Sequence, residues 1–161
     1  MEGCVNGRGM TGPDQPQAEH FAGGEHRLPL RVYYEDTDLS GVVYHANYLR
    51  YMERARSDML REAGIDQRAA HEAGEGAYAV ADLHIRYLAP ARLDDALVVV
   101  SRLAEVTPAR VVIHQTVRRD AVLLAEAKVV VAFVAPTGRP RRQPRGWIDI
   151  YTQLLAQGGP K

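Results

Sequence analysis

Five polar or ionisable side chains crowd into the 14 residues 34–47: Tyr34, Asp36, Asp38, His45 and Asn47. An ionised carboxylate can act as a nucleophile or a general base, and a positioned acid or base contributes about 10² to 10⁴ in rate. The residues that follow have helical periodicity, so this stretch leads into a helix N-terminus, whose unpaired N–H groups stabilise an oxyanion. The pattern therefore predicts acyl-transfer chemistry, with Asp38 as the central carboxylate.

Structural roles compete with this interpretation. Asp-Thr-Asp is also ordinary turn chemistry, which favours Asp36 as a turn residue and leaves Asp38 open between an Asx turn and catalysis. A single histidine such as His45 is more often packed or solvated, and Tyr34 is typical of a strand; their spacing around Asp38 favours an active-site role. No other residues complete a metal coordination sphere at helical or loop spacing, so we expect no metal and no cofactor.

One long helix is predicted directly after this stretch. Its apolar positions recur at helical period, and they are Tyr48, Met52, Ala55, Met59 and Ala63. Asn47 is expected to cap the start of the helix and Gly64 its end. The intervening positions are mostly charged, so the helix should have one buried and one solvated side.

Segments of β character make up most of the remaining chain. In residues 110–118, Val111, Ile113 and Val117 alternate with polar residues, which is typical of a half-buried antiparallel strand. The connections are too short for crossover helices. We expect an α+β fold, a curved antiparallel sheet of about five strands wrapped around one long helix, with a short helix near the C-terminus. The expected strands cover residues 27–34, 77–88, 96–106, 110–118 and 121–134.

Composition and charge narrow the functional class. The chain has 20 basic and 20 acidic residues and a pI near 7.0, which argues against nucleic acid or an anionic membrane as the main partner. Cys4 is the single cysteine, and no apolar run resembles a secretory signal or a membrane span, so a cytoplasmic location is expected. We expect a flexible leader at 1–26, one domain at 27–157 and a disordered tail at 158–161.

A resemblance to a known family rests on three segments. Residues 34–49 read Y-x-x-x-D-x-x-G-V-V-Y-H-A-N-Y-L and are followed by E-R-A-R at 53–56. This run resembles the bacterial acyl-CoA thioesterases associated with the Tol-Pal cluster, in the 4-hydroxybenzoyl-CoA thioesterase branch of the hotdog fold. H-I-R-Y-L-A-P-A-R-L-D-D at 84–95 and G-R-P-R-R-Q-P at 138–144 resemble a strand with its turn and a later loop of the same family.

The resemblance implies roles for individual residues. Asp38 matches the catalytic aspartate, which attacks the thioester carbonyl or activates a water that does; both mechanisms stay open, as does the preferred acyl chain. Tyr34 and His45 match further active-site positions, and the backbone N–H near His45 would polarise the thioester oxygen. Further substrate-binding positions are expected at Gly41, Val42, Asn47 and Glu53.

Charged residues outside the first motif could also meet the substrate. Arg141 and Arg142 lie in a basic segment that is either a solvated surface or a contact for CoA phosphates, which arginine suits. For Glu53, an ion pair with a nearby arginine is favoured over a role as a base. The resemblance implies a homodimer or homotetramer with sites at subunit interfaces, and acyl carrier protein or lipid-synthesis enzymes as further partners.

Three other functions compete with the thioesterase hypothesis. D-T-D after a strand also occurs in haloacid-dehalogenase-type phosphatases, but these need a parallel sheet and a downstream acidic pair for Mg²⁺. A hotdog hydratase would need a His and Asp arrangement that is not evident. A non-catalytic acyl-CoA or acyl-carrier binding module, or an envelope-complex adaptor, is the remaining alternative, although such a module would not need Asp38.

Overall fold

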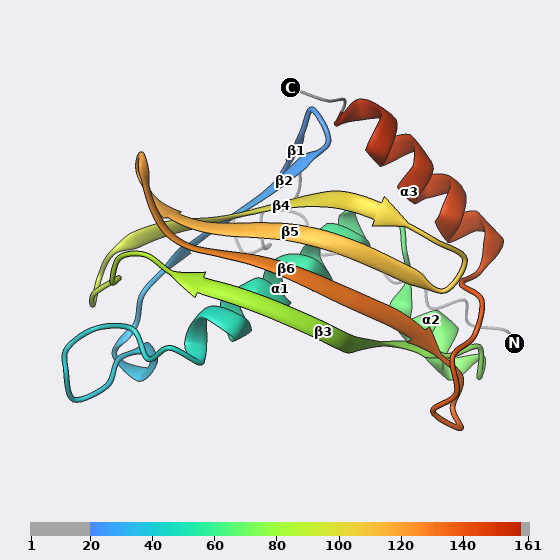
Figure 1. Ribbon diagram of the computed structural model, residues 1–161, viewed down its shortest axis with the longest axis horizontal. Coiled ribbons are helices and arrows are strands. Elements are labelled where there is room, and N and C mark those ends of the chain that lie inside the picture. Colours follow the sequence, from blue (N-terminus) through green and yellow to red (C-terminus); the bar gives the residue numbers. More distant parts are fainter. Residues whose placement is uncertain (1–19, 159–161) are drawn as a thin grey trace, which may run out of the picture.

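The computed structural model describes residues 20–158, which form one antiparallel sheet and three α-helices (Figure 1). The strand order is β1-β2-β4-β5-β6-β3, and every neighbouring pair is antiparallel. The strands are β1 (Phe21–Ala22), β2 (Glu25–Arg31), β3 (Ala77–Tyr87), β4 (Ala96–Val106), β5 (Arg110–Arg119) and β6 (Val122–Val134). The helices are α1 (Asn47–Glu62), α2 (Gln67–Glu72) and α3 (Arg145–Gln157), with a short 3₁₀ helix η1 at Tyr34–Asp36. The predicted α+β architecture is confirmed.

Helix α1 fills the concave side of the sheet (Figure 1). Four of the five residues of the predicted apolar stripe, from Tyr48 to Met59, are buried in the core, and Ala63 is half-buried. On the facing side, Val111, Ile113 and Val117 of β5 are buried as the alternation predicts. Burial of apolar surface contributes about 25 cal/mol per Å². It is the main contribution to the free energy that holds α1 on the sheet.

The two ends of α1 differ from each other. At the C-terminal end, Gly64 has a φ of +92° and its N–H donates to Arg61 O at 3.1 Å, while the Ile65 N–H reaches Leu60 O at 2.9 Å. This is a Schellman motif, so the predicted glycine cap is confirmed. At the N-terminal end, Ala46 occupies the cap position without a side-chain bond, and Asn47 is the first helical residue. The prediction that Asn47 caps the helix is wrong, because its side chain is committed elsewhere.

The sheet begins at Phe21, inside the stretch expected to be a leader. β1 pairs Phe21 with His26 of β2, and the His26 side chain is completely buried. A two-residue strand with one large apolar side chain is too short to produce a visible period-2 pattern. Cys4 and the rest of residues 1–19, like 159–161, lie outside the described residues.

Strand β3 is the edge of the sheet beyond β6. Most of its residues are exposed, including Val80 and Tyr87. The C-terminal helix α3 lies against β4, with Tyr151 buried and its hydroxyl 2.7 Å from the Tyr78 hydroxyl. Within residues 20–158, no helix combines the length and the hydropathy that crossing a membrane requires.

Candidate active site

The loop between β2 and α1 contains the predicted catalytic residues. Backbone hydrogen bonds hold this loop in a defined conformation. Isolated bridges pair Thr37 with Val43 and Val42 with Arg92, and the Val43 N–H donates to Ala91 O at 2.8 Å. These contacts bind the loop to the turn between β3 and β4. Its residues are therefore positioned by backbone hydrogen bonds on both sides.

Asp36 and Asn47 form the buried support of this loop. Asp36 is only 3% exposed; its carboxylate accepts from the Tyr33 N–H at 2.8 Å and from the Asn47 side-chain amide at 2.5 Å. Its backbone oxygen also accepts from the Tyr44 N–H at 2.9 Å. Both residues thus act as positioning residues, which agrees with the turn role favoured for Asp36 and gives Asn47 a structural task.

Asp38 points its carboxylate into solvent. Its Oδ1 accepts hydrogen bonds from the Ser40 hydroxyl and, at 2.8 Å, from the Ser40 N–H, while Oδ2 has no partner within residues 20–158. The Ser40 hydroxyl, then the Ser40 N–H, lower the pKa of Asp38 below its ordinary value, and the His45 side chain adds to this. Asp38 is therefore an ionised carboxylate with one oxygen held and one oxygen available.

Gly41 shapes the turn that presents Asp38. Its φ of +79° lies in the left-handed region that glycine adopts readily, and its N–H donates to Asp38 O at 3.0 Å. The Asp38 N–H in turn donates to Val42 O at 3.1 Å. Gly41 and Val42 thus form the tight turn under the carboxylate.

His45 stands one residue before the cap of α1, with its side chain exposed. Its backbone N–H donates no hydrogen bond within the described residues, whereas Tyr44 O on the same peptide group accepts from the Asn47 N–H at 2.8 Å. In a planar trans peptide the C=O and the N–H point in opposite directions. The His45 N–H is thus held away from the helix, where an acceptor from the solvent side can reach it.

Two tyrosines surround His45. The Tyr87 hydroxyl at the end of β3 donates to His45 O at 2.8 Å, which holds the next peptide group. The imidazole packs on Tyr44 with ring centroids 4.6 Å apart. Tyr34 lies in η1 at the start of the same loop, with its side chain 83% exposed. The first motif thus presents Asp38, His45 and Tyr34 as exposed side chains, and of these the His45 side chain lies close enough to Asp38 to lower its pKa.

Glu53 lies on α1 beyond this area and is paired with Arg56, as favoured from the sequence. Arg56 is buried and its guanidinium also donates to the Gln115 side chain at 2.8 Å. Glu53 and Arg56 line a narrow cavity between α1 and the sheet, together with Tyr78 and Val80 of β3. Glu53 therefore lies beside the beginning of β3, whereas the loop that carries Asp38 and His45 is held at the end of β3 by Tyr87.

The remaining predicted residues, Arg141 and Arg142, do not approach Asp38. The Arg141 guanidinium donates to Glu75 O at 2.7 Å, next to the beginning of β3. The Arg141 backbone N–H donates to Phe133 O at 2.9 Å. The Asp38 loop and the 138–142 loop lie at opposite ends of β3 (Figure 1). The strand has 11 residues at about 3.3 Å each, which separates the two loops by roughly 35 Å.

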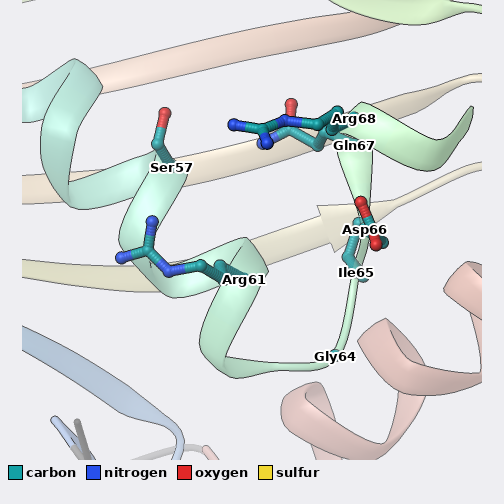
Figure 2. Close-up of a pocket in the computed structure, with 7 residues that line it drawn as sticks. All are labelled: Ser57, Arg61, Gly64, Ile65, Asp66, Gln67 and Arg68. Carbon is teal, nitrogen blue, oxygen red and sulfur yellow. The ribbon is translucent and has the colours of Figure 1, made fainter. Parts of the chain in front are cut away.

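A further basic depression lies at the C-terminal end of α1 (Figure 2). Arg61 and Arg68 line it with Ser57 and Gln67. Asp38 precedes the other end of this 16-residue helix, which is about 24 Å long. The depression is therefore remote from the Asp38 carboxylate.

Two residues of the site were missed from the sequence. Ser40 is two positions after Asp38, and the Asx-turn pattern Asp-x-Ser was the available signal. Tyr87 is 42 positions from His45, and no local pattern links them.

Comparisons with known proteins identify the family of this chain. Residues 32–149 match the thioesterase-like superfamily. The chain is 44% identical over 107 residues to the acyl-CoA thioesterase YbgC of Haemophilus influenzae, covering 66% of this chain and 79% of that protein. It is 41% identical over 129 residues to the acyl-CoA thioester hydrolase YbgC of Escherichia coli O6:H1, covering 79% and 96%. A probable thioesterase from Bartonella henselae superimposes with a TM-score of 0.71 at 36% identity, over 74% of this chain and 99% of that one.

Proposed function

Because this chain belongs to the thioesterase-like superfamily, it is a hotdog-fold acyl-CoA thioesterase, and we propose that Asp38 performs its hydrolytic step. The reaction adds water across the acyl C–S bond and yields a free carboxylic acid and the CoA thiol. The observation that supports Asp38 is its exposed, ionised carboxylate near the His45 side chain, together with a His45 backbone N–H that donates no hydrogen bond within residues 20–158.

The carbonyl oxygen of the thioester is polarised by the backbone. As a nucleophile adds to the carbonyl carbon, negative charge develops on that oxygen. The His45 N–H is held in place by the Tyr44–Asn47 bond, and the N-terminus of α1 adds about half an elementary positive charge. Donors that need no reorganisation stabilise an oxyanion best. The imidazole of His45 is not required for this role.

Asp38 then acts in one of two ways. As a nucleophile, Oδ2 bonds to the acyl carbon, the C–S bond breaks, the CoA thiolate takes a proton from water, and a second water hydrolyses the mixed anhydride. As a general base, Asp38 removes a proton from the attacking water and the proton passes to the leaving thiolate. A single turnover in ¹⁸O water separates them, since only the anhydride route places ¹⁸O in the Asp38 side chain.

An acyl-CoA panel assayed by release of free CoA tests the function. We expect Asp38→Asn to lower kcat/KM by about 10² to 10⁴, with folding unchanged because the side chain is exposed. Asp120→Asn is the matched control: Asp120 is exposed in the β5–β6 turn with a φ of +52°, which asparagine tolerates. Wild-type turnover in Asp38→Asn would rule out this mechanism.

We also propose that two copies of the chain complete each site by pairing their β3 edges. Arg141 and the cavity at Glu53 both lie near the beginning of β3, whereas Asp38 lies near its end. When two β3 strands pair antiparallel about a two-fold axis, the beginning of one meets the end of the other. Arg141 and Arg142 of one copy would thereby reach the CoA phosphates of a substrate held at Asp38 of the other.

We also propose a cellular location and partner proteins. The resemblance of the first motif supports association with the Tol-Pal envelope system, with acyl carrier protein or lipid-synthesis enzymes as partners. An acyl-CoA substrate and the single cysteine support a cytoplasmic location. Cell fractionation tests the location, and acyl-carrier-protein thioesters added to the substrate panel test the carrier.

A further inference from the structure

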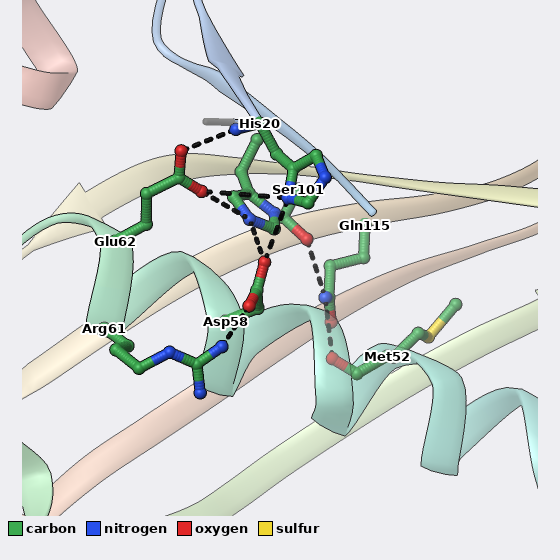
Figure 3. A network of polar contacts seen from close by, with 8 residues as sticks. His20, Met52, Asp58, Arg61, Glu62, Ser101 and Gln115 are labelled. Atoms are coloured by element: carbon green, nitrogen blue, oxygen red, sulfur yellow. Dashed lines mark hydrogen bonds and ion pairs between the residues drawn. The ribbon is translucent and has the colours of Figure 1, made fainter. Parts of the chain in front are cut away.

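A cluster of metal-ligating side chains lies between the N-terminal hairpin and α1, away from the active site (Figure 3). Its four members are contributed by the β1–β2 hairpin and by two positions one turn apart on α1. These members, called the hairpin–helix cluster, are His20, His26, Asp58 and Glu62.

The distances within the cluster are close to those of a tetrahedral coordination sphere. His26 Nε2 lies 2.9 Å from Asp58 Oδ2 and 3.3 Å from Glu62 Oε2. His20 Nδ1 lies 3.3 Å from Asp58 Oδ2 and 4.0 Å from Glu62 Oε2. Tetrahedral Zn²⁺ with bonds of about 2.0 to 2.2 Å separates its ligand atoms by about 3.3 to 3.6 Å. All four ligand atoms lie within 4.8 Å of one another, so small side-chain adjustments close the sphere.

Charge also favours a cation at this place. Asp58 and Glu62 are like charges at i and i+4 on one helix face, which is unfavourable in the absence of a partner. Within the described residues, Arg61 is the only Lys or Arg paired with either carboxylate, and it contacts Asp58 Oδ1 from the solvent side. The oxygens that face the two imidazoles, Asp58 Oδ2 and Glu62 Oε2, have no Lys or Arg partner in the part of the chain that the structure describes.

The surroundings suit a structural site. His26 is completely buried, and the other three side chains are 16 to 18% exposed, so an ion can enter and then be enclosed. Two imidazoles and two carboxylates form a borderline nitrogen–oxygen set that suits Zn²⁺. Asp58 lies 11 positions along α1 from Asn47, about 16 Å from the active-site end of the helix. Four protein ligands leave no open position for chemistry.

We propose that the hairpin–helix cluster binds a divalent transition-metal ion, with Zn²⁺ as the ion of choice. The ion fastens the β1–β2 hairpin to α1, where β1 supplies only two strand residues of its own. The expectation of no metal site rested on finding no ligand pair at helical or loop spacing that would complete a sphere with the Asp38 loop. The hairpin–helix cluster instead combines Asp58 and Glu62 with two histidines from 20–26, the end of the expected leader.

Titration of the chelator-stripped full chain with Zn²⁺ tests the proposal. We expect one high-affinity Zn²⁺ per chain by calorimetry. At a free Zn²⁺ concentration 100 times Kd, Tm should rise by about 5 to 10 °C, because the ion binds the folded state only. Mg²⁺ at the same concentration should leave Tm unchanged, since it takes oxygen ligands in octahedral geometry. Co²⁺ should give the intense visible absorption of a tetrahedral complex.

Ligand variants locate the ion. His20→Ala and Glu62→Gln remove ligands that are partly exposed, so the fold should survive, and circular dichroism verifies this. Each should weaken Zn²⁺ binding by more than the roughly 10- to 100-fold that loss of an outer-shell partner costs. His71→Ala, an exposed histidine on α2, is the matched control and should bind as wild type does. Absence of high-affinity Zn²⁺ in the wild type, or unchanged affinity in both ligand variants, would show a cluster held by hydrogen bonds and ion pairs only.

Discussion

At the scale of single residues, the two oxygens of Asp38 have different surroundings. Oδ1 is held by Ser40, whereas Oδ2 faces solvent and is available to a substrate or a water. Asp36, two positions earlier, is buried and fully engaged with Asn47 and the loop backbone. The two aspartates of this motif therefore have different roles. Asp36 supports the loop, and the loop presents Asp38 to solvent.

Ser40 should set the acidic limit of activity. It lowers the pKa of Asp38, and a mechanism that needs ionised Asp38 loses rate as pH falls through that pKa. Ser40→Ala removes the hydroxyl hydrogen bond that lowers the Asp38 pKa most, so the Asp38 pKa should rise. The acidic limb of kcat/KM against pH should therefore move to higher pH. Thr152→Ala, at an exposed position on α3, should leave the profile unchanged. An identical acidic limb in Ser40→Ala would contradict this assignment.

Tyr87 should act on the rate through the backbone. Its hydroxyl holds the peptide group after His45, so Tyr87→Phe keeps the ring and loses only the bond to His45 O. We expect kcat to fall by about 10-fold with little change in KM, a smaller loss than direct removal of an oxyanion donor brings. Tyr44→Phe is the control, because no hydrogen bond of the Tyr44 hydroxyl occurs within residues 20–158. A rise in KM alone would instead indicate a role in binding.

At the scale of elements, α1 joins the two sites of the molecule. Its first turn supports the His45 backbone, and its last two turns carry Asp58 and Glu62. Between them, a buried row from Tyr48 to Met59 fixes the rotation of the helix on the sheet. Any change that shortens or rotates α1 should therefore displace both the His45 backbone and the carboxylates of Asp58 and Glu62.

The glycine that ends α1 gives a direct test of this element. Gly64→Ala places a Cβ at a φ of +92°, which should lower the free energy of unfolding by about 1 to 2 kcal/mol. Gly146→Ala is the opposite case, because Gly146 lies in the first turn of α3 with helical backbone and open space around it. It should be neutral or stabilising by up to about 1 kcal/mol. Urea unfolding measures both, and equal effects would contradict the proposed cause.

At the scale of the whole molecule, the exposed β3 edge is the feature that a single chain does not use. Its outward N–H and C=O groups have no strand partner within the described residues, and large apolar side chains lie along it and beside it. An unpaired edge of this length is normally covered or paired. The proposed pairing with a second copy would cover this edge and would bring the separated halves of the proposed site together.

A charge on this edge should dissociate the pair. Val80→Glu should shift the mass measured by light scattering from dimer toward monomer and lower activity, because a carboxylate would be buried against the partner strand. Val122→Glu, at an equally exposed valine in the β5–β6 hairpin, should leave the mass unchanged. A wild-type monomer with full turnover would refute the shared site.

Subunit mixing tests which copy supplies the arginines. Asp38→Asn and Arg141→Ala/Arg142→Ala should each be poorly active. Unfolding and refolding them together should restore about one quarter of wild-type activity, since half of the dimers are mixed and each holds one intact site. Without such recovery, the arginines either act within their own chain or do not bind substrate.

Much of the fold can be predicted from the sequence, because the spacing of apolar residues along a helix or strand indicates which of its sides is buried. The alternation of Val111, Ile113 and Val117 predicted an antiparallel strand, and the apolar stripe from Tyr48 onward predicted the long helix. The short connections excluded a parallel sheet. These features depend on residues within one turn or one strand pair, where periodicity and steric limits act directly.

The sequence by itself determined the family, the place of the reactive loop and the identity of Asp38 as its candidate carboxylate. Only the tertiary structure decided that Asn47 supports Asp36 instead of capping α1, and that Tyr87 braces His45. It also separated Arg141 from Asp38 and gathered two histidines onto Asp58 and Glu62. The physical reason is that side chains far apart in the chain meet only when helix and sheet pack, and packing is set by the whole core, not by any local pattern.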